Sequence, residues 1–246
     1  MHGKHIKGFG GAMGNLRELR RTRALLLVGS LIVVIVLCTG CFGASYSLDR
    51  DESIKTEWGA VIQYKIDDSW AASPSNGANS YSATASFHGD SAWLSFAMEN
   101  ADDSSYKYSS TSTYSGWLEN QREFYTQSAA DQAAWYKEYM SDSRYYDESK
   151  TNPSAYPDRT NYSMKEMGAT RVGDVDFRLY TMKYTLSYSD EAYSRLKEEA
   201  PNTQQKQVED HEMHYAIVKD GTHDFEVGAN DERLLMDFMR TLQIKW

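Results

Sequence analysis

The sequence HEMHYAIVKDGTHDFEVG at residues 211–228 contains two apolar segments joined by Lys219-Asp220-Gly221. Alternating apolar residues on both sides of a short, glycine-containing loop are typical of a β-hairpin. A three-residue loop with Gly221 in the left-handed conformation places the large apolar side chains opposite one another, whereas a two-residue loop does not. The sequence therefore predicts that Ile217 pairs with His223, Tyr215 with Phe225, and Met213 with Val227.

A helix is predicted to follow this hairpin. Asn230 suits the N-cap position, and Asp231 and Glu232 suit the positive end of the helix dipole. The next apolar residues have the spacing of one helical face, and they are Leu234, Leu235, Phe238, Met239 and Leu242. We expect Ile244 and Trp246 to pack beneath the sheet.

Two further strand regions are predicted near the start of the folded part. Val61–Ile66 has strand character and ends at a turn formed by residues 67–70, Asp-Asp-Ser-Trp. Tyr81–Phe87 and Ala92–Met98 both alternate between apolar and polar residues, and residues 88–90, His-Gly-Asp, separate them. This pattern predicts a second hairpin.

A third hairpin is predicted from Tyr162–Val172, a turn at Gly173-Asp174, and Val175–Tyr188. Along the second of these strands the apolar residues change from odd to even positions near Leu179. Either a β-bulge near Leu179 or a strand buried on both faces explains this change.

Three helical segments are predicted from their periodicity, at Trp117–Tyr125, Ser128–Met140 and Ser189–Ala200. Ser128 and Asp131 have the spacing of a capping box, and Pro201 ends the last of these helices. The polar residues 141–161 are predicted to form a long loop. The order of strands, helices, strands and a terminal helix predicts an α+β domain with an antiparallel sheet.

The net charge is distributed unevenly along the chain. Residues 1–40 carry six basic residues and one acidic residue, a net charge of +5. The whole chain has a net charge of −9, so the remainder carries −14. A part of the chain this acidic repels a phosphate backbone, so we expect no nucleic-acid partner.

The N-terminal region has the pattern of an export segment. The sequence divides into a basic cytoplasmic region (1–23), a hydrophobic segment (24–41), a flexible tether (42–56) and an extracytoplasmic domain (57–246). Basic residues before a hydrophobic segment tend to stay in the cytoplasm, so the downstream domain is predicted to face outward. The hydrophobic segment is at the short end of what spans a bilayer.

Residues 37–41, Leu-Cys-Thr-Gly-Cys, resemble the lipobox of bacterial lipoproteins, in which small residues precede a cysteine that receives a diacylglyceryl group. Thr39, Gly40 and Cys41 fit the pattern, whereas Cys38 stands where the family usually has leucine. The resemblance implies lipid attachment at Cys41 and a location at the outer side of the plasma membrane. The alternative is an uncleaved transmembrane anchor, in which both cysteines are ordinary small apolar residues.

The domain resembles the PsbP-like domain of many bacterial lipoproteins. Three features carry the resemblance, and they are the strand and turn of Val61–Trp70, the hairpin around Gly173, and the terminal helix followed by Leu242-Gln-Ile-Lys-Trp246. The helical insertion at 113–161 is longer than the family usually carries. The resemblance implies an α/β/α sandwich, in which helices cover the sheet, and a non-enzymatic role in binding or assembly.

The chemistry-bearing residues do not form a recognisable catalytic or metal motif. His211 and His214 are three apart on a predicted strand, so their side chains point to opposite faces and cannot share a metal ion. The acidic pairs lack calcium-loop spacing and are predicted to form turns and solvated charge; they are Asp67-Asp68, Asp102-Asp103 and Asp174/Asp176. No metal or cofactor is expected.

The preferred hypothesis is a non-catalytic module that binds an envelope protein, a peptide or a glycan. The chain has 18 tyrosines, including Tyr106/Tyr108 and Tyr145/Tyr146 in polar stretches, where they suit binding of a peptide or glycan. Most of the tyrosines are expected to cover the sheet and helices. The alternative is an envelope hydrolase, which a pocket with Ser or Asp beside His88 or His211 would favour.

Overall fold

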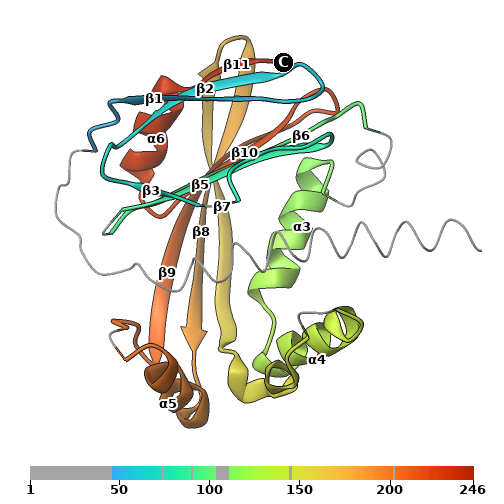
Figure 1. Ribbon diagram of the computed structural model, residues 1–246, viewed down its shortest axis with the longest axis vertical. Helices are drawn as coiled ribbons and strands as arrows, with labels where there is room; N and C mark the ends of the chain where they lie inside the picture. The colour runs from blue at the N-terminus through green and yellow to red at the C-terminus, as the bar shows by residue number, and fades with distance from the viewer. Residues whose placement is uncertain (1–45, 74, 90, 104–110, 144–145, 202) are drawn as a thin grey trace, which may run out of the picture.

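The computed structural model of the chain describes residues 46–73, 75–89, 91–103, 111–143, 146–201 and 203–246. These residues form an α+β domain in which every pair of neighbouring strands is antiparallel (Figure 1). The predicted fold class, α+β with an antiparallel sheet, is therefore confirmed.

The domain contains two sheets. The larger sheet has the order β3-β5-β6-β10-β9-β8-β7, with β4 beside β5, and the smaller sheet has the order β1-β2-β11. The strands are β1 (Arg50–Lys55), β2 (Val61–Ile66), β3 (Ala71–Ala72), β4 (Gly77–Ala78), β5 (Ser82–His88), β6 (Trp93–Glu99), β7 (Asp158–Val172), β8 (Val175–Ser187), β9 (Val208–Lys219), β10 (Asp224–Ala229) and β11 (Gln243–Lys245). The α-helices within the described residues are α3 (Tyr114–Tyr125), α4 (Ala129–Met140), α5 (Asp190–Glu199) and α6 (Glu232–Thr241).

One face of the larger sheet packs against the smaller sheet and α6. We call this region the sandwich core. Tyr64 of β2 lies 5.0 Å from Phe96 of β6 between ring centroids, and Phe96 lies 6.0 Å from Phe238 of α6. The residues predicted to face inward are buried, and they are Leu234, Leu235, Phe238 and Met239 of α6 and Leu242 directly after it.

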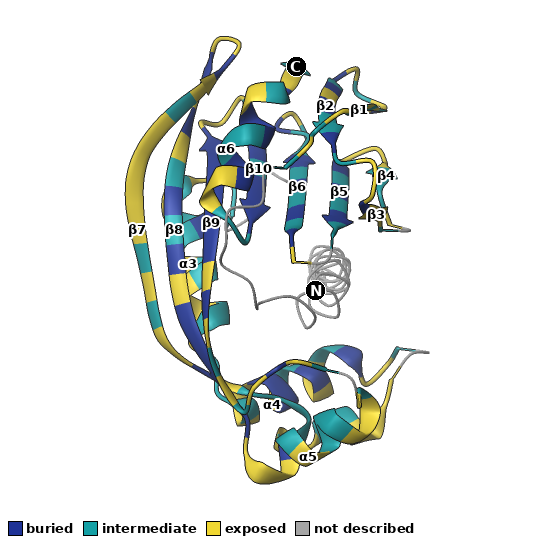
Figure 2. Cartoon of the chain, turned by 90° about the vertical axis from the view of Figure 1, so that its left-hand side faces the viewer, coloured by how far each residue is buried: buried dark blue, intermediate teal, exposed yellow. Residues whose placement is uncertain are grey.

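The strands β7, β8 and β9 extend beyond the sandwich core as an arm that ends near α4 and α5 (Figure 1). The opposite face of the larger sheet packs against α3 and α5 along this arm, and we call that region the arm core. Trp117 of α3 contacts Tyr180 and Tyr215 at ring-centroid distances of 5.7 and 5.4 Å. Figure 2 shows β8 and β9 largely buried, whereas the edge strand β7 is mostly exposed.

The predicted change of buried face in β8 is confirmed. Val175 and Phe177 contribute to the sandwich core, whereas Tyr180 and Met182 contribute to the arm core. β8 pairs with β9 without a shift in register. The change of face therefore follows from burial against two different cores, while a β-bulge lies on β7, between Glu166 and Gly168. A bulge on an edge strand also protects that edge from pairing with another chain.

The register of the β9–β10 hairpin differs from the prediction. Phe225 pairs with Val218, and Val227 pairs with Ala216, around a four-residue loop at 220–223. Asp220 stabilises this loop, because its side chain accepts hydrogen bonds from the backbone N–H groups of Thr222 and His223 at 2.9 and 2.7 Å. Gly221 has φ +87°, so its predicted left-handed conformation is confirmed.

The register is also set by burial of β9 on both faces. The small residues Ala216 and Val218 face the sandwich core beside Phe225, and the larger Tyr215 and Ile217 face the arm core. The predicted register placed Tyr215 opposite Phe225, on the assumption that one face of the hairpin is buried. That assumption is wrong for a central strand between two cores.

Several predicted boundaries need correction. Part of the predicted tether, Arg50–Lys55, forms β1, which pairs with β2 and packs Ile54 against the sandwich core. The strand is mostly polar, so it has no apolar period in the sequence. The predicted loop 141–161 contains two short 3₁₀ helices, Glu148–Thr151 and Pro153–Ala155, and β7 begins within it at Asp158.

The ends of α6 also differ in detail from the prediction. Asp231, not Asn230, is the N-cap, and its side chain accepts from the N–H of Leu234 at 2.8 Å. Asn230 joins the helix start to β6, because its side chain accepts from the N–H of Trp93 at 2.8 Å. After the helix, Ile244 packs on the sandwich core, whereas Trp246 is 37% exposed and lies against His223.

Candidate functional site

A groove lies between the tips of the two long hairpins. β8 and β9 pair from Ser187↔Val208 up to Arg178↔Ile217 and separate beyond that point. The β7–β8 tip and the β9–β10 loop then border an open, shallow groove of about 790 Å³. Its lining residues are Tyr114, Glu166, Gly168, Ala169, Asp174, Val175, Asp176, Arg178, Val218, Asp220 and His223.

Arg178 and Tyr114 form one wall of the groove. The guanidinium carbon of Arg178 lies 4.0 Å from the Tyr114 ring centroid, a distance typical of a cation–π contact. A hydrogen bond to the Tyr180 hydroxyl raises the pKa of Arg178. The Tyr180 hydroxyl donates to Glu166 at 3.3 Å. Residues from α3, β7 and β8 are thus held together by one polar chain.

Carboxylates outnumber cations in the groove. Glu166, Asp174, Asp176 and Asp220 line it, together with Arg178 and His223. Arg171, just outside the lining, lies 3.9 Å from a carboxylate oxygen of both Asp174 and Asp176.

The imidazole of His223 is in contact with Asp220. The His223 Nδ1 and a carboxylate oxygen of Asp220 are 2.8 Å apart. Burial raises the pKa of Asp220, but hydrogen bonds from His223 and Thr222 outweigh it, so the pKa is lowered. Asp220 is therefore held as a carboxylate at the rim of the groove.

Polar contacts connect the β9–β10 hairpin internally and to α3. Lys219 Nζ lies 2.9 Å from both carboxylate oxygens of Asp224, and both side chains are buried. Trp117 Nε1 donates to Glu226 at 2.7 Å. Burial raises the pKa of Glu226, although Lys219 and Trp117 act in the opposite direction. The first contact joins the two strands of the β9–β10 hairpin, and the second joins α3 to β10.

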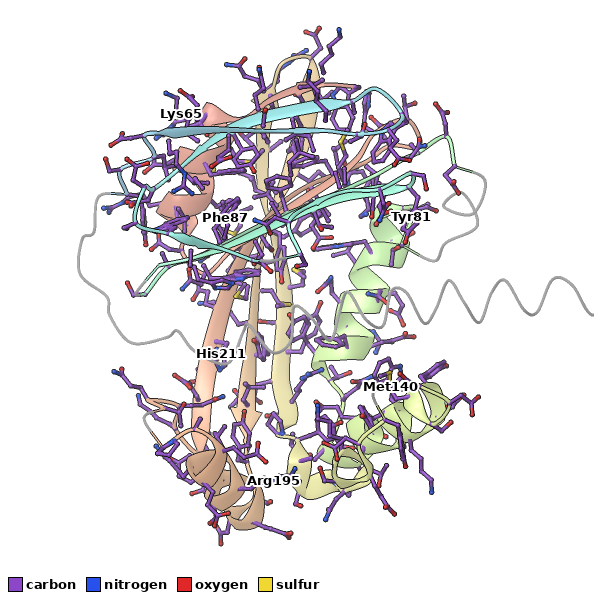
Figure 3. The ribbon with its side chains drawn as sticks, viewed as in Figure 1. Lys65, Tyr81, Phe87, Met140, Arg195 and His211 are labelled. Atoms are coloured by element: carbon purple, nitrogen blue, oxygen red, sulfur yellow. The ribbon has the colours of Figure 1, made fainter. Side chains whose placement is uncertain are left out.

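The two predicted histidines lie on opposite sides of β9, as expected from their spacing. His211, labelled on β9 in Figure 3, stacks on Tyr184 of the arm core at a ring-centroid distance of 5.0 Å. His211 Nε2 is buried, has no hydrogen-bond partner, and lies 3.9 Å from Glu209. His214 Nδ1 lies 3.2 Å from the Thr181 hydroxyl. Burial lowers the pKa of both imidazoles.

His88, the other candidate of the hydrolase hypothesis, contacts a serine. Its Nε2 lies 3.3 Å from the hydroxyl of Ser86, two residues earlier on β5. Burial lowers the pKa of His88. Within the described parts of the chain, no carboxylate is hydrogen-bonded to His88, and neither residue lines the groove. The contact therefore carries no assignment as a catalytic pair.

The remaining predicted site residues fall in different places. Cys41 and the predicted export segment lie outside the described residues, as do Tyr106, Tyr108 and Tyr145. Asp67 forms a turn as predicted, because it accepts from the N–H of Ser69 at 2.9 Å. Among the residues that the structure describes, no three His, Cys, Asp or Glu side chains group as metal ligands, and no helix is long and apolar enough to cross a membrane.

Sequence reasoning did not identify the groove. Asp174 and Asp176 were expected to be turn and solvated residues, and both also line the groove. Arg178 and Tyr114 come from β8 and α3, and no local motif links them. The one local signal was the pair Asp176 and Arg178, opposite charges two residues apart on the same face of a strand.

No protein-family model, no curated protein and no solved structure matches this chain.

Proposed function

We propose that the chain is an exported lipoprotein whose α+β domain is a non-catalytic binding module of the cell envelope. In this proposal a lipid on Cys41 holds the domain at the outer side of the plasma membrane. The observation that carries it is the order of a basic region, an apolar run and the small residues Thr39-Gly40 directly before Cys41. An acyl chain contributes ~0.8 kcal/mol per buried CH₂, so two or three chains anchor a protein stably.

The short distance in sequence between Cys41 and the folded domain restricts where the module works. The first described residue is Tyr46, whose ring packs edge-on against Trp70 at 6.1 Å. Five residues span at most roughly 18 Å when fully extended, at ~3.6 Å per residue. A lipid on Cys41 would therefore keep the domain close to the bilayer surface, within reach of membrane-bound partners.

We also propose that the domain is PsbP-like. It is supported by α6 followed by β11 and Trp246, and by the β7–β8 hairpin that turns at Gly173. The helices α3 and α4 lie in the insertion at 113–161, which is longer than the family usually carries. The proposed role in binding is supported by the open groove, which is lined by four carboxylates.

Mass spectrometry of the mature N-terminus tests the lipoprotein proposal. The full-length protein would be produced in a bacterium with an alkyne-labelled fatty acid, beside Cys41→Ser and the matched variant Cys38→Ser. We expect the wild-type and Cys38→Ser proteins to begin at an acylated Cys41, and Cys41→Ser to lose the label. A membrane-bound protein that retains Met1 would instead establish the uncleaved anchor, and a cytosolic protein that retains Met1 would refute export.

A further inference from the structure

Lys219 and Asp224 lie opposite each other at the closed end of the β9–β10 hairpin. They form the last pair of the ladder before the loop at 220–223. Lys219 Nζ lies 2.9 Å from each carboxylate oxygen of Asp224. A nitrogen at equal distances from both oxygens lies directly opposite the carboxyl carbon, Cγ. The pair is therefore close to a near-attack arrangement, in which reacting atoms about 3–3.5 Å apart behave as if they were highly concentrated.

The pair is shielded from solvent. The Lys219 side chain is 4% exposed and that of Asp224 is 2% exposed. Both side chains lie on the face of the hairpin that carries Ile217, because residues two apart on a strand share a face. A buried ammonium–carboxylate pair recovers only part of the solvation that its charges lose, so conversion to a neutral product removes a destabilising feature. The exclusion of water also disfavours the reverse reaction, hydrolysis.

Glu226 provides a third functional group on the same face. It follows Asp224 by two positions on β10 and is half-buried. Its Oε2 accepts a hydrogen bond from Trp117 Nε1 at 2.7 Å, which orients the carboxyl group. Burial raises the pKa of Glu226, and Lys219 is close enough to act on it in the opposite direction. Glu226 is thus placed to pass protons to and from the Lys219–Asp224 pair.

We propose that Lys219 and Asp224 are joined by an isopeptide bond in the folded protein. Proton transfer within the pair gives a neutral amine and a neutral carboxylic acid. The Nζ lone pair forms a bond to Asp224 Cγ, the C–O bond to the hydroxyl group breaks, and the hydroxyl leaves as water with a proton from Glu226. Glu226 then takes one proton from the nitrogen, which becomes the amide N–H. The net change is the loss of one water molecule, and no oxidant or cofactor is consumed.

The isopeptide bond supplies a covalent link in a domain without cysteine. The only two cysteines of the chain, Cys38 and Cys41, precede β1, so the domain cannot contain a disulfide. The ring that the bond closes is short, so the stability gained by restricting the unfolded chain is small. The bond instead keeps the end of the hairpin closed when the loop at 220–223 is cut. This inference goes beyond the proposed binding role and is independent of lipid attachment at Cys41.

Peptide mapping of the full-length wild-type protein tests the proposal. The protein is produced in a bacterium, purified in detergent, denatured, and digested with trypsin, which cuts after unmodified lysine and arginine. We expect one fragment of residues 207–233 that is uncut after Lys219 and lighter than its sequence by one water molecule. Fragments 207–219 and 220–233 at their full masses would overturn the proposal.

A second protease locates the bond. Cleavage before Asp220 should leave the two sides of the cut connected, and tandem mass spectrometry should place the link between Lys219 and Asp224. The Asp220-Gly221 step also loses water when a succinimide forms, but this reaction leaves the Lys219 amine unmodified, and trypsin then cuts after it. Water loss confined to residues 220–221, or a link from Lys219 to another carboxyl group, would refute the proposal.

Lys219→Arg is the matched variant for the nucleophile. It keeps a cation beside Asp224 but lacks a nucleophilic amine. We expect the variant to be cut after position 219 and to retain its full mass, with a circular dichroism spectrum like that of the wild type. Water loss in the 207–233 region that persists in this variant would contradict the assignment to Lys219.

Substitution of Glu226 tests its part in proton transfer. Glu226→Gln keeps an acceptor for Trp117 but cannot exchange a proton, so the linked fragment should form about 100-fold more slowly in a pulse-labelling experiment, the lower end of what general acid–base catalysis contributes. Glu123→Gln removes the same charge from an exposed position of α3 and should link at the wild-type rate. An equal rate in Glu226→Gln and the wild type would show that Glu226 takes no part.

Discussion

In the sandwich core, Tyr64, Phe96 and Phe238 contact one another from three different elements. In the arm core, by contrast, Trp117 donates to the Glu226 carboxylate, and His211 stacks on Tyr184. The first core is stabilised by burial of apolar surface. The second depends in addition on buried polar groups, whose hydrogen bonds specify how α3 and the arm pack together.

The largest loss in the free energy of unfolding should come from truncating a side chain in the sandwich core. Phe238 is fully buried between Tyr64 and Phe96, so Phe238→Ala removes an aromatic ring and leaves a cavity. We expect a loss of about 3–5 kcal/mol in the free energy of unfolding, measured by urea denaturation.

Arg233, on the exposed face of the same helix, provides the control. Arg233→Ala should change the free energy of unfolding by less than ~0.5 kcal/mol. If both variants lost the same stability, the loss would not depend on burial of the side chain, and α6 would not act as a packing element of the sandwich core.

A smaller loss of stability is expected when the hydrogen bond between Trp117 and Glu226 in the arm core is removed. Trp117→Phe keeps an aromatic ring but removes the donor to Glu226, which leaves a half-buried carboxylate with one hydrogen bond fewer. We expect a loss of about 1–3 kcal/mol in the free energy of unfolding, followed by circular dichroism.

The double variant Trp117→Phe/Glu226→Gln isolates the polar contribution. Replacing the carboxylate with a neutral amide should recover part of the loss, because an unpaired buried charge costs more than an unpaired amide. If the two substitutions were simply additive, the hydrogen bond would contribute nothing, and the arm core would be as apolar in its energetics as the sandwich core.

The same contrast explains which features the sequence predicted. The α6 face and the Ser128–Asp131 capping box follow from local spacing, and the structure confirms both. The register of β9 depends on burial on both of its faces, and β1 is too polar to show an apolar period, so local patterns predicted neither.

Local sequence patterns did not predict the groove, because its residues come from different elements. Its wall joins Tyr114 to Arg178, and its rim joins Glu166 to Asp176, so each pair combines residues from different elements. Tertiary packing alone brings these residues together. Lipid attachment at Cys41 rests on a local motif, and it stays a prediction because Cys41 lies outside the described residues.

The smallest effect is expected from the pH dependence of the arm core. Burial lowers the pKa of His211 below its unfolded value of about 6.5, so the folded chain binds fewer protons than the unfolded chain as the pH falls through that value. The stability contributed by neutral His211 is therefore complete above pH ~6.5 and decreases below it. Urea denaturation of wild type and His211→Gln across this pH range measures the contribution.

Measuring both proteins at several pH values separates the titration of His211 from the packing of its ring. His211→Gln loses the stacking on Tyr184 at every pH, whereas only the wild type should lose further stability from the imidazole as the solution becomes acidic. Other groups that titrate, including His88 and His214, contribute equally to both proteins and cancel in the difference. The difference in the free energy of unfolding between wild type and His211→Gln could instead stay the same at every pH. His211 would then take up its proton as readily in the folded arm as in the unfolded chain. The arm core would then tolerate a charge at that position, and its contrast with the sandwich core would rest on Glu226 and Trp117 alone.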